Sequence, residues 1–159
     1  MEYIDRHEAR LQKMNEEADK IIRNWSFGAL VANLLPPPFD SIAVASAFAK
    51  MGHEISKVYE VQVTWEKLKQ LGKSMFKGIG AVTAASYIGT GLFKYIPGVN
   101  VVVALLVQPP IVGIISYTVG QGYKKYFVSI IKGKELSAEE IKKSVEAEFK
   151  REMDKKQNK

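Results

Sequence analysis

The sequence predicts an all-α fold of two helical hairpins with apolar, glycine-rich arms, flanked by amphipathic helices at the N- and C-terminus. All six prolines fall in three places, Pro36–Pro38, Pro97 and Pro109–Pro110, and the intervening segments are long enough for helices. No segment shows a convincing strand-type alternation of apolar and polar residues. Because 159 residues leave no room for two full cores, we expect a single helical domain over residues 1–159.

Residues 1–24 are predicted to form an amphipathic helix, because apolar residues recur on one face and charged residues cover the others. The spacing alternates between three and four residues, which is typical of a coiled-coil seam. The seam holds Ile4, His7, Leu11, Met14, Ala18, Ile21 and Trp25. The charges of Arg6, Arg10 and Glu17 lie off this seam, where we expect them to select the partner.

The second predicted helix is capped by Asp40 or Ser41 and runs to about Leu71, with Gly72 as its stop. Its apolar stripe holds Val44, Phe48, Met51, Ile55, Val58, Gln62 and Trp65. The preceding turn at the proline triplet would make the first hairpin.

The third predicted helix covers residues 73–96 and ends at the turn Pro97–Gly98, which makes the second hairpin. A fourth covers residues 99–132, where Pro109–Pro110 must kink or split it because proline lacks a backbone donor. The turn residues of both hairpins are therefore Pro36, Pro38, Asp40, Pro97 and Gly98.

The last segment, residues 136–159, is predicted as a charged helix that opens with a capping box from Ser137 to Glu140. Its apolar face holds Ile141, Val145, Phe149 and Met153. Between the two charged flanks, residues 25–135 form an apolar core region with small residues at four-residue spacing. Those expected to permit close helix packing are Gly28, Gly80, Ala84, Gly89, Gly113 and Gly120.

The composition argues against most catalytic chemistry. The chain has no cysteine and two histidines, which excludes thiolate metal sites and makes a multi-histidine metal site unlikely. The stretch Leu71–Ser74 resembles the end of a phosphate-binding loop but lacks the required upstream glycine. His53 has no evident nucleophile beside it. We therefore expect no enzyme activity, no cofactor and no metal.

The charge distribution indicates membrane contact. Residues 95–123 carry no charge, and residues 78–93 form a second uncharged run that Lys94 separates from the first. The side chains expected to contact lipid are Trp25, Phe27, Leu30, Val101, Val102, Leu105, Leu106, Ile111, Ile114 and Ile115. We expect lipid headgroups to be bound by Lys73, Lys77, Lys124 and Lys125, which a hairpin would bring to one end.

The net charge of +6 has a second interpretation, nucleic-acid binding, which the tail does not favour. It is rich in lysine and has Arg151 as its single arginine. Since the first 24 residues also lack a secretory signal, we expect the cytoplasmic side of a bacterial inner membrane. A soluble cytoplasmic protein is the alternative.

Three segments resemble a known family: residues 33–60 (NLLPPPFDSIAVASAFAKMGHEISKVYE), 94–100 (KYIPGVN) and 116–127 (SYTVGQGYKKYF). Together they are similar to the signatures of a YcjF-like bacterial domain of unknown function. Matching positions in the first segment are Pro36, Pro38, Asp40, Met51 and Tyr59. The resemblance covers roughly residues 25–135, whereas Asn100 and the double proline Pro109–Pro110 depart from the family pattern.

The resemblance implies no chemistry, but it does imply a context. Family members are often fused to, or encoded beside, Era- or Ras-like GTPases, and several are membrane proteins. This chain has no GTPase domain of its own, so the resemblance implies a separate polypeptide as partner. The first hypothesis is therefore a non-enzymatic, membrane-associated module that oligomerises or docks a GTPase. The alternative is a soluble α-helical homo-oligomer. A pore ranks last, since the uncharged run 95–123 offers only the amide groups of Asn100, Gln108 and Gln121 to line one.

Overall fold

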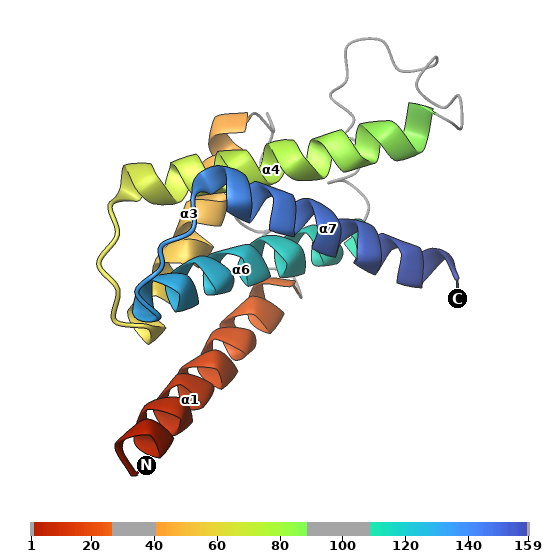
Figure 1. Cartoon of the computed structure of the whole chain (residues 1–159). Coiled ribbons are helices and arrows are strands. Elements are labelled where there is room, and N and C mark those ends of the chain that lie inside the picture. The colour runs from red at the N-terminus through yellow and green to blue at the C-terminus, as the bar shows by residue number, and fades with distance from the viewer. Residues whose placement is uncertain (1, 27–40, 89–108, 159) are drawn as a thin grey trace.

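The structure is a computed structural model that describes residues 2–26, 41–88 and 109–158 (Figure 1). Within these residues the chain forms five helices and no strand, which confirms the all-α prediction. The helices are α1 (Glu2–Asn24), α3 (Ser41–Val58), α4 (Trp65–Ile88), α6 (Pro109–Ile131) and α7 (Ala138–Gln157). All the predicted turn residues, Pro36, Pro38, Asp40, Pro97 and Gly98, lie outside the described residues.

The predicted single helix from residue 41 to residue 71 is wrong, because α3 and α4 are separate helices joined by residues 59–64. Glu60 adopts a left-handed backbone conformation with φ of 57°. Its N–H donates to the carbonyl of Lys57 at 3.2 Å, and the next N–H, of Val61, donates to the carbonyl of Ser56 at 3.1 Å. These two bonds form a Schellman motif, which ends α3.

The start of α4 is set by Thr64, whose hydroxyl oxygen accepts a hydrogen bond from the backbone N–H of Lys67 at 3.2 Å. The helix then passes through Gly72 without interruption, so the prediction that Gly72 stops a helix is also wrong. A Cβ placed on Gly72 would lie 3.0 Å from the Tyr123 hydroxyl and 3.2 Å from Phe48 Cβ. This glycine therefore serves close packing.

The boundaries of α6 and α7 follow local rules. The described part of the predicted helix 99–132 begins at Pro109, where proline costs no hydrogen bond because the first helical N–H groups have no partner within the helix. At the other end Gly133, with φ of 77°, forms a second Schellman motif. The capping box of α7 is confirmed: Glu140 N–H donates to Ser137 Oγ at 3.1 Å, and Ser137 N–H donates to Glu140 Oε2 at 2.8 Å.

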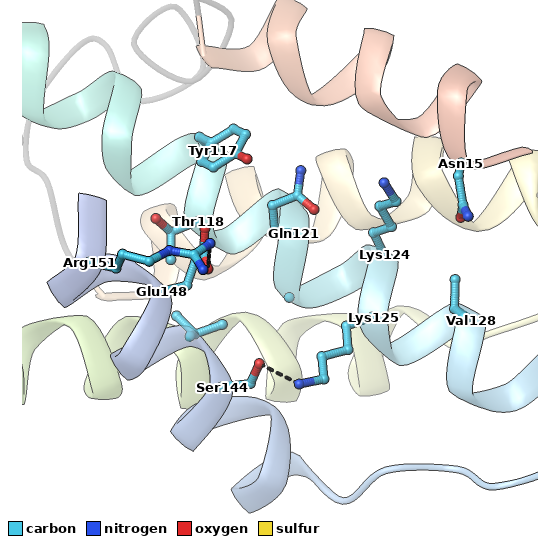
Figure 2. A pocket seen from close by; sticks show the side chains of 12 residues that line it. Asn15, Tyr117, Thr118, Gln121, Lys124, Lys125, Val128, Ser144, Glu148 and Arg151 are labelled. Atoms are coloured by element: carbon cyan, nitrogen blue, oxygen red, sulfur yellow. Dashed lines mark hydrogen bonds and ion pairs between the residues drawn. The ribbon is translucent and has the colours of Figure 1, made fainter. Parts of the chain in front are cut away.

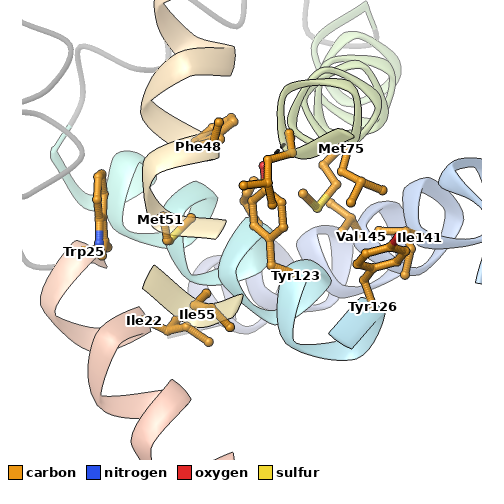
Figure 3. Packing of buried hydrophobic residues seen from close by; sticks show 14 of the residues in the cluster. Ile22, Trp25, Phe48, Met51, Ile55, Met75, Tyr123, Tyr126, Ile141 and Val145 are labelled. Carbon is orange, nitrogen blue, oxygen red and sulfur yellow. Dashed lines mark hydrogen bonds between the residues drawn. The ribbon is translucent and has the colours of Figure 1, made fainter. Parts of the chain in front are cut away.

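Tyr123 of α6 stands at the centre of the core (Figure 3). Its side chain is fully buried, and its hydroxyl donates to the backbone carbonyl of Leu68 in α4 at 2.7 Å. Its ring also faces Gly52 of α3. The predicted apolar face of α7 is likewise buried at Ile141, Val145 and Phe149. One buried side chain thus joins three helices, and the predicted face of α7 adds a fourth to the same core.

The helices pack as antiparallel pairs. Tyr59 near the end of α3 bonds Asn15 in the middle of α1, whereas Trp25 at the end of α1 bonds Glu54. In the second pair, Tyr123 in the last half of α6 bonds the first turn of α4. Both pairs have the direction expected of the two predicted hairpins, whose turns lie outside the described residues.

This packing gives the molecule two distinct ends. One end carries the connections 59–64 and 132–137, together with the N-terminus of α1 (Figure 1). The helix α3 begins beside the first half of α4, where the Ala45 carbonyl oxygen would lie 3.5 Å from a Cβ at Gly72, whereas α1 and α4 stop and α6 begins toward the opposite end (Figure 1). Close contact between Gly113 of α6 and the Ser26 carbonyl, 3.3 Å from a Cβ at Gly113, supports this arrangement. We call this the open end.

Candidate functional site

The backbones of the four lysines predicted to bind headgroups lie near one another, because Gly72, which precedes Lys73 in α4, contacts Tyr123, which precedes Lys124 in α6. Their side chains diverge from there. Lys73 and Lys77 are exposed on α4. Lys124 turns to α1, where its Nζ lies 2.8 Å from Asp19 Oδ1, and Lys125 turns to α7, where its Nζ donates to Ser144 Oγ at 2.8 Å. The structure therefore divides the predicted cluster between two surfaces.

A groove with a volume of about 420 Å³ lies between α1, α6 and α7 (Figure 2). Most of its lining side chains come from α6, while α1 and α7 contribute the others. The lining residues are Asn15, Tyr117, Thr118, Gln121, Gly122, Lys124, Lys125, Val128, Ser144, Val145, Glu148 and Arg151. We call this the basic groove, because three of its side chains are cations and one is an anion.

Each cation of the basic groove has a partner within the chain. Lys124 has a side chain that is 19% exposed and pairs with Asp19, which is 41% exposed. Arg151 pairs with Glu148 one helical turn away at 2.5 Å. The partner of Lys125 is the neutral hydroxyl of Ser144, so this bond leaves its positive charge uncompensated.

The neutral groups of the basic groove include donors that are already used within the chain: Gln121 Nε2 donates to Asp19 Oδ1 at 3.4 Å, and Thr118 Oγ1 donates to the Ile114 carbonyl at 2.7 Å. Asn15 Oδ1 accepts from the Tyr59 hydroxyl at 2.7 Å, which leaves the Asn15 amide nitrogen as its remaining donor. Burial, and then the nearby carboxylates of Glu148, Glu152 and Asp19, raise the pKa of Tyr117 above its ordinary value. Tyr117 therefore keeps its proton at neutral pH and lines the groove as a hydroxyl.

The structure corrects two of the residues predicted to contact lipid. Trp25 is 4% exposed, and its Nε1 donates to Glu54 Oε2 at 3.1 Å, while Ile115 is fully buried. Both side chains serve the core because α1 and α6 pack against their neighbours at these positions. Ile114 is half-buried beside the core, and the side chain of Ile111 is not described. The others, Phe27, Leu30, Val101, Val102, Leu105 and Leu106, lie outside the described residues.

Of the predicted packing residues, Gly120 makes the closest approach: a Cβ there would lie 2.7 Å from Ile22 Cγ1 of α1. Gly113 meets the Ser26 carbonyl, and Gly80 is half-buried in α4. The side chain of Ala84 is not described, and Gly28 and Gly89 lie outside the described residues.

Sequence reasoning missed Gly72 and Gly78 as packing glycines, and also Gly52 and Gly122. A Cβ at Gly52 would lie 2.7 Å from the Tyr123 ring, and one at Gly122 would lie 2.7 Å from Val145 Cγ2. The sequence shows Gly120 and Gly122 as a closely spaced pair. It does not reveal what Gly52 and Gly122 contact, because their partners lie on other helices.

Two further findings bear on function. None of the helices in the described ranges has both the length and the apolar character needed to cross a bilayer. In the same ranges, no group of three or more histidine, aspartate or glutamate side chains is arranged to hold a metal ion.

Comparison with known proteins gives a relative and a family. The chain is 25% identical over 111 residues to magnetosome membrane protein 22 of Magnetospirillum gryphiswaldense. The match covers 69% of this chain and 57% of that relative, so it spans little more than half of the relative's length. No solved structure matches the chain. The family model described as a domain of unknown function, DUF697, matches residues 5–154, a range that extends from α1 to α7. The chain therefore belongs to the DUF697 family.

Proposed function

We propose that the chain is a membrane-associated helical module whose open end faces the bilayer. The observation that carries this proposal is that α1 and α4 stop, and α6 begins, at one end of the helical core. By sequence, residues 27–40 between α1 and α3 hold Asp40 as their single charge, and residues 89–108 between α4 and α6 hold Lys94 as theirs.

The common end matters because a bilayer meets one side of a protein at a time. Two apolar segments that follow helices ending on opposite sides would require two surfaces, whereas these two segments follow α1 and α4, which both stop at the open end, and can meet the same membrane. Burial of apolar area stabilises by about 25 cal/mol per Å², so two segments that insert together bind more strongly than one.

The charge of α7 suits the same orientation. Since α7 starts at the connection 132–137, its last turns lie toward the open end. These turns carry the exposed residues Lys150, Lys155 and Lys156. A lysine near an anionic membrane surface contributes about 1 kcal/mol to binding. The name of the relative, a magnetosome membrane protein, supports membrane association at the level of the shared domain.

The protein–protein part of the proposal concerns the first half of α1, which extends beyond the other helices (Figure 1). Tyr3 and Ile4 are 75% and 59% exposed there. We propose that this half contacts another polypeptide, either a second copy or a separate GTPase, and that the chain acts by binding rather than catalysis. Size measurement by light scattering, with and without an Ile4→Glu substitution, tests the self-association.

The alternative, a soluble homo-oligomer, rests on glycine-rich arms packed between subunits. In the described structure the close contacts of Gly72, Gly120 and Gly122 are all made within one chain. This observation favours the membrane module, because these glycines have partners without a second subunit.

Flotation with vesicles of phosphatidylglycerol and phosphatidylcholine tests the proposal. We expect the chain to float with the vesicles, and a Leu105→Glu/Leu106→Glu variant to lose at least tenfold in bound fraction. The matched control is Trp65→Glu/Ile131→Glu, which places the same charge at the opposite end, where both side chains are exposed. Recovery of the native chain as a soluble monomer that does not float would contradict the proposal.

A further inference from the structure

We propose that the basic groove binds a phosphate group, carried by a small molecule or by a lipid headgroup. The groove lies on the side of the molecule between α1, α6 and α7, and its lining is independent of which end faces a membrane. The inference therefore stands on the groove itself and goes beyond the proposed function.

The first argument is the balance of donors and acceptors. Cationic donors come from Lys124, Lys125 and Arg151, whereas the lining holds one carboxylate, Glu148. The Tyr117 hydroxyl and the amide nitrogen of Asn15 add neutral donors, whereas Gln121 Nε2 already donates to Asp19 Oδ1 at 3.4 Å. A lining with three cations and one carboxylate is complementary to an anion with several acceptor oxygens, which is the chemistry of phosphate.

The second argument is that the contacts within the chain leave donor capacity free. Arg151 has five N–H donors, and its NH2 group meets Glu148. An ammonium group carries three donors, and Lys125 directs one of them to the neutral Ser144. In contrast, Lys124 is largely covered and is held by Asp19, so we assign it to structure and to the local field.

The third argument is that the groove has cations from two different helices in its lining. Lys125 belongs to α6 and Arg151 to α7, and both line the same hollow (Figure 2). The volume of about 420 Å³ falls within the range of about 300 to 1,000 Å³ that is typical of small-molecule sites. This volume has room for a phosphate together with the group to which the phosphate is attached.

The test is a titration of the full chain with inorganic phosphate and with glycerol 3-phosphate, followed by amide NMR shifts at constant ionic strength set with sodium chloride. We expect saturable shifts at residues of the basic groove. The variant Lys125→Gln/Arg151→Gln should bind at least tenfold more weakly. The matched control is Lys73→Gln/Lys77→Gln, which removes the same charge from exposed positions on α4 and should stay within twofold of the native chain.

A second arm identifies the source of the phosphate. Vesicles of phosphatidylglycerol are compared with vesicles of phosphatidylcholine for the native chain and both variants. Binding of vesicles that depends on Lys125 and Arg151, without binding of free phosphate, assigns the groove to a lipid headgroup. Binding of free phosphate with unchanged vesicle binding assigns it to a soluble ligand.

Either double variant could lose affinity through a loss of fold, so helix content and thermal unfolding are measured for both. Equal losses in two folded variants would overturn the proposal, because net charge would then account for binding. Shifts that do not saturate, or that spread over the whole surface, with no groove-dependent vesicle binding would also overturn it. A chain that binds phosphate in the groove but does not float contradicts the proposed membrane function alone.

Discussion

At the scale of single residues, close packing of the core requires glycines at positions where a Cβ would overlap a large neighbouring side chain. Gly52 faces the ring of Tyr123, which cannot move away easily because its hydroxyl is bonded to the Leu68 carbonyl. Gly78 of α4 is nearly as close to a neighbour, at 2.9 Å from a Cβ against 2.7 Å at Gly52, but that neighbour is the flexible side chain of Glu146 on α7. The same change at these two positions should therefore have different effects.

We expect Gly52→Ala to lower the free energy of unfolding by about 2 kcal/mol, because overpacking a rigid contact costs more than the gain in helix propensity returns. Gly78→Ala should change it by less than about 1 kcal/mol, because Glu146 can shift. Urea denaturation followed by circular dichroism measures both. Equal losses would show that the Tyr123 ring is no more rigid than the Glu146 side chain.

Tyr123 itself gives a pH-dependent prediction. Burial raises its pKa far above the ordinary value near 10, so the folded chain keeps a proton that the unfolded chain releases. Its contribution to stability is therefore complete below pH 10 and is lost as the pH rises above 10. Each such group lowers the free energy of unfolding by about 1.4 kcal/mol per pH unit in that range.

Tyr123→Phe should lower the free energy of unfolding by about 1 kcal/mol at pH 7, through loss of the hydrogen bond to Leu68. Above pH 10 the free energy of unfolding of this variant should fall less steeply with pH, because one titrating hydroxyl has been removed. Tyr3→Phe is the control, because Tyr3 is 75% exposed. Urea unfolding from pH 8 to pH 11 measures both effects. An unchanged alkaline slope in Tyr123→Phe would show that this hydroxyl titrates normally in the folded chain.

At the scale of elements, two helices end in the same motif at the same end of the molecule. Gly133 adopts φ of 77° after α6, and a Cβ there would meet no atom within 4 Å. Glu60 adopts φ of 57° after α3 with a full side chain, and its carboxylate pairs with Arg10 of α1 at 2.5 Å. The two positions separate backbone preference from side-chain contact.

Gly133→Ala should lower the free energy of unfolding by about 1 kcal/mol, since only the backbone conformation opposes the new side chain. Glu60→Gly should raise the free energy of unfolding by about 0.5 kcal/mol. Glycine adopts the left-handed conformation without strain, and this gain is larger than the stabilisation lost with the exposed ion pair to Arg10. Thermal and urea unfolding measure both variants. A loss of stability in Glu60→Gly would mean that the contact with Arg10 outweighs the backbone cost.

These elements also show what the sequence can predict. The capping box of α7 was predictable because both of its partners lie within four residues of each other. The break after α3 was not, because Val58, Gln62 and Trp65 continue the helical stripe, and Glu60 carries none of the glycine or proline signals of a helix end. Gly72 was misread as a stop because its partner, Tyr123, is remote in sequence.

The candidate site shows the same division. The two lysines of α6 were predictable as a basic pair beside an uncharged run. Their opposite directions depend on Asp19 of α1 and Ser144 of α7, which only the packed structure brings close. The contribution of Arg151 to the basic groove likewise depends on how α7 packs, so the groove could not be predicted from sequence spacing.

At the scale of the whole molecule, the account rests on an end-to-end asymmetry. At one end, the short connections 59–64 and 132–137 join consecutive helices. At the open end, α1 and α4 stop and are followed by the two charge-poor segments, residues 27–40 and 89–108. This asymmetry explains how a chain with a mean hydropathy of −0.09 suits a membrane surface. The average combines charged flanking helices with apolar segments that leave from one end.

The most direct test uses the absence of cysteine, because single-cysteine variants can be labelled without background. An environment-sensitive fluorophore is attached at Leu105→Cys in the charge-poor segment and, separately, at Lys132→Cys at the opposite end. In vesicles with phosphatidylglycerol and nitroxide-labelled lipid, the label at position 105 should shift to shorter wavelength and be quenched, while the label at position 132 stays unchanged. Quenching at position 132, or no quenching at position 105, would contradict the claim that the open end faces the bilayer.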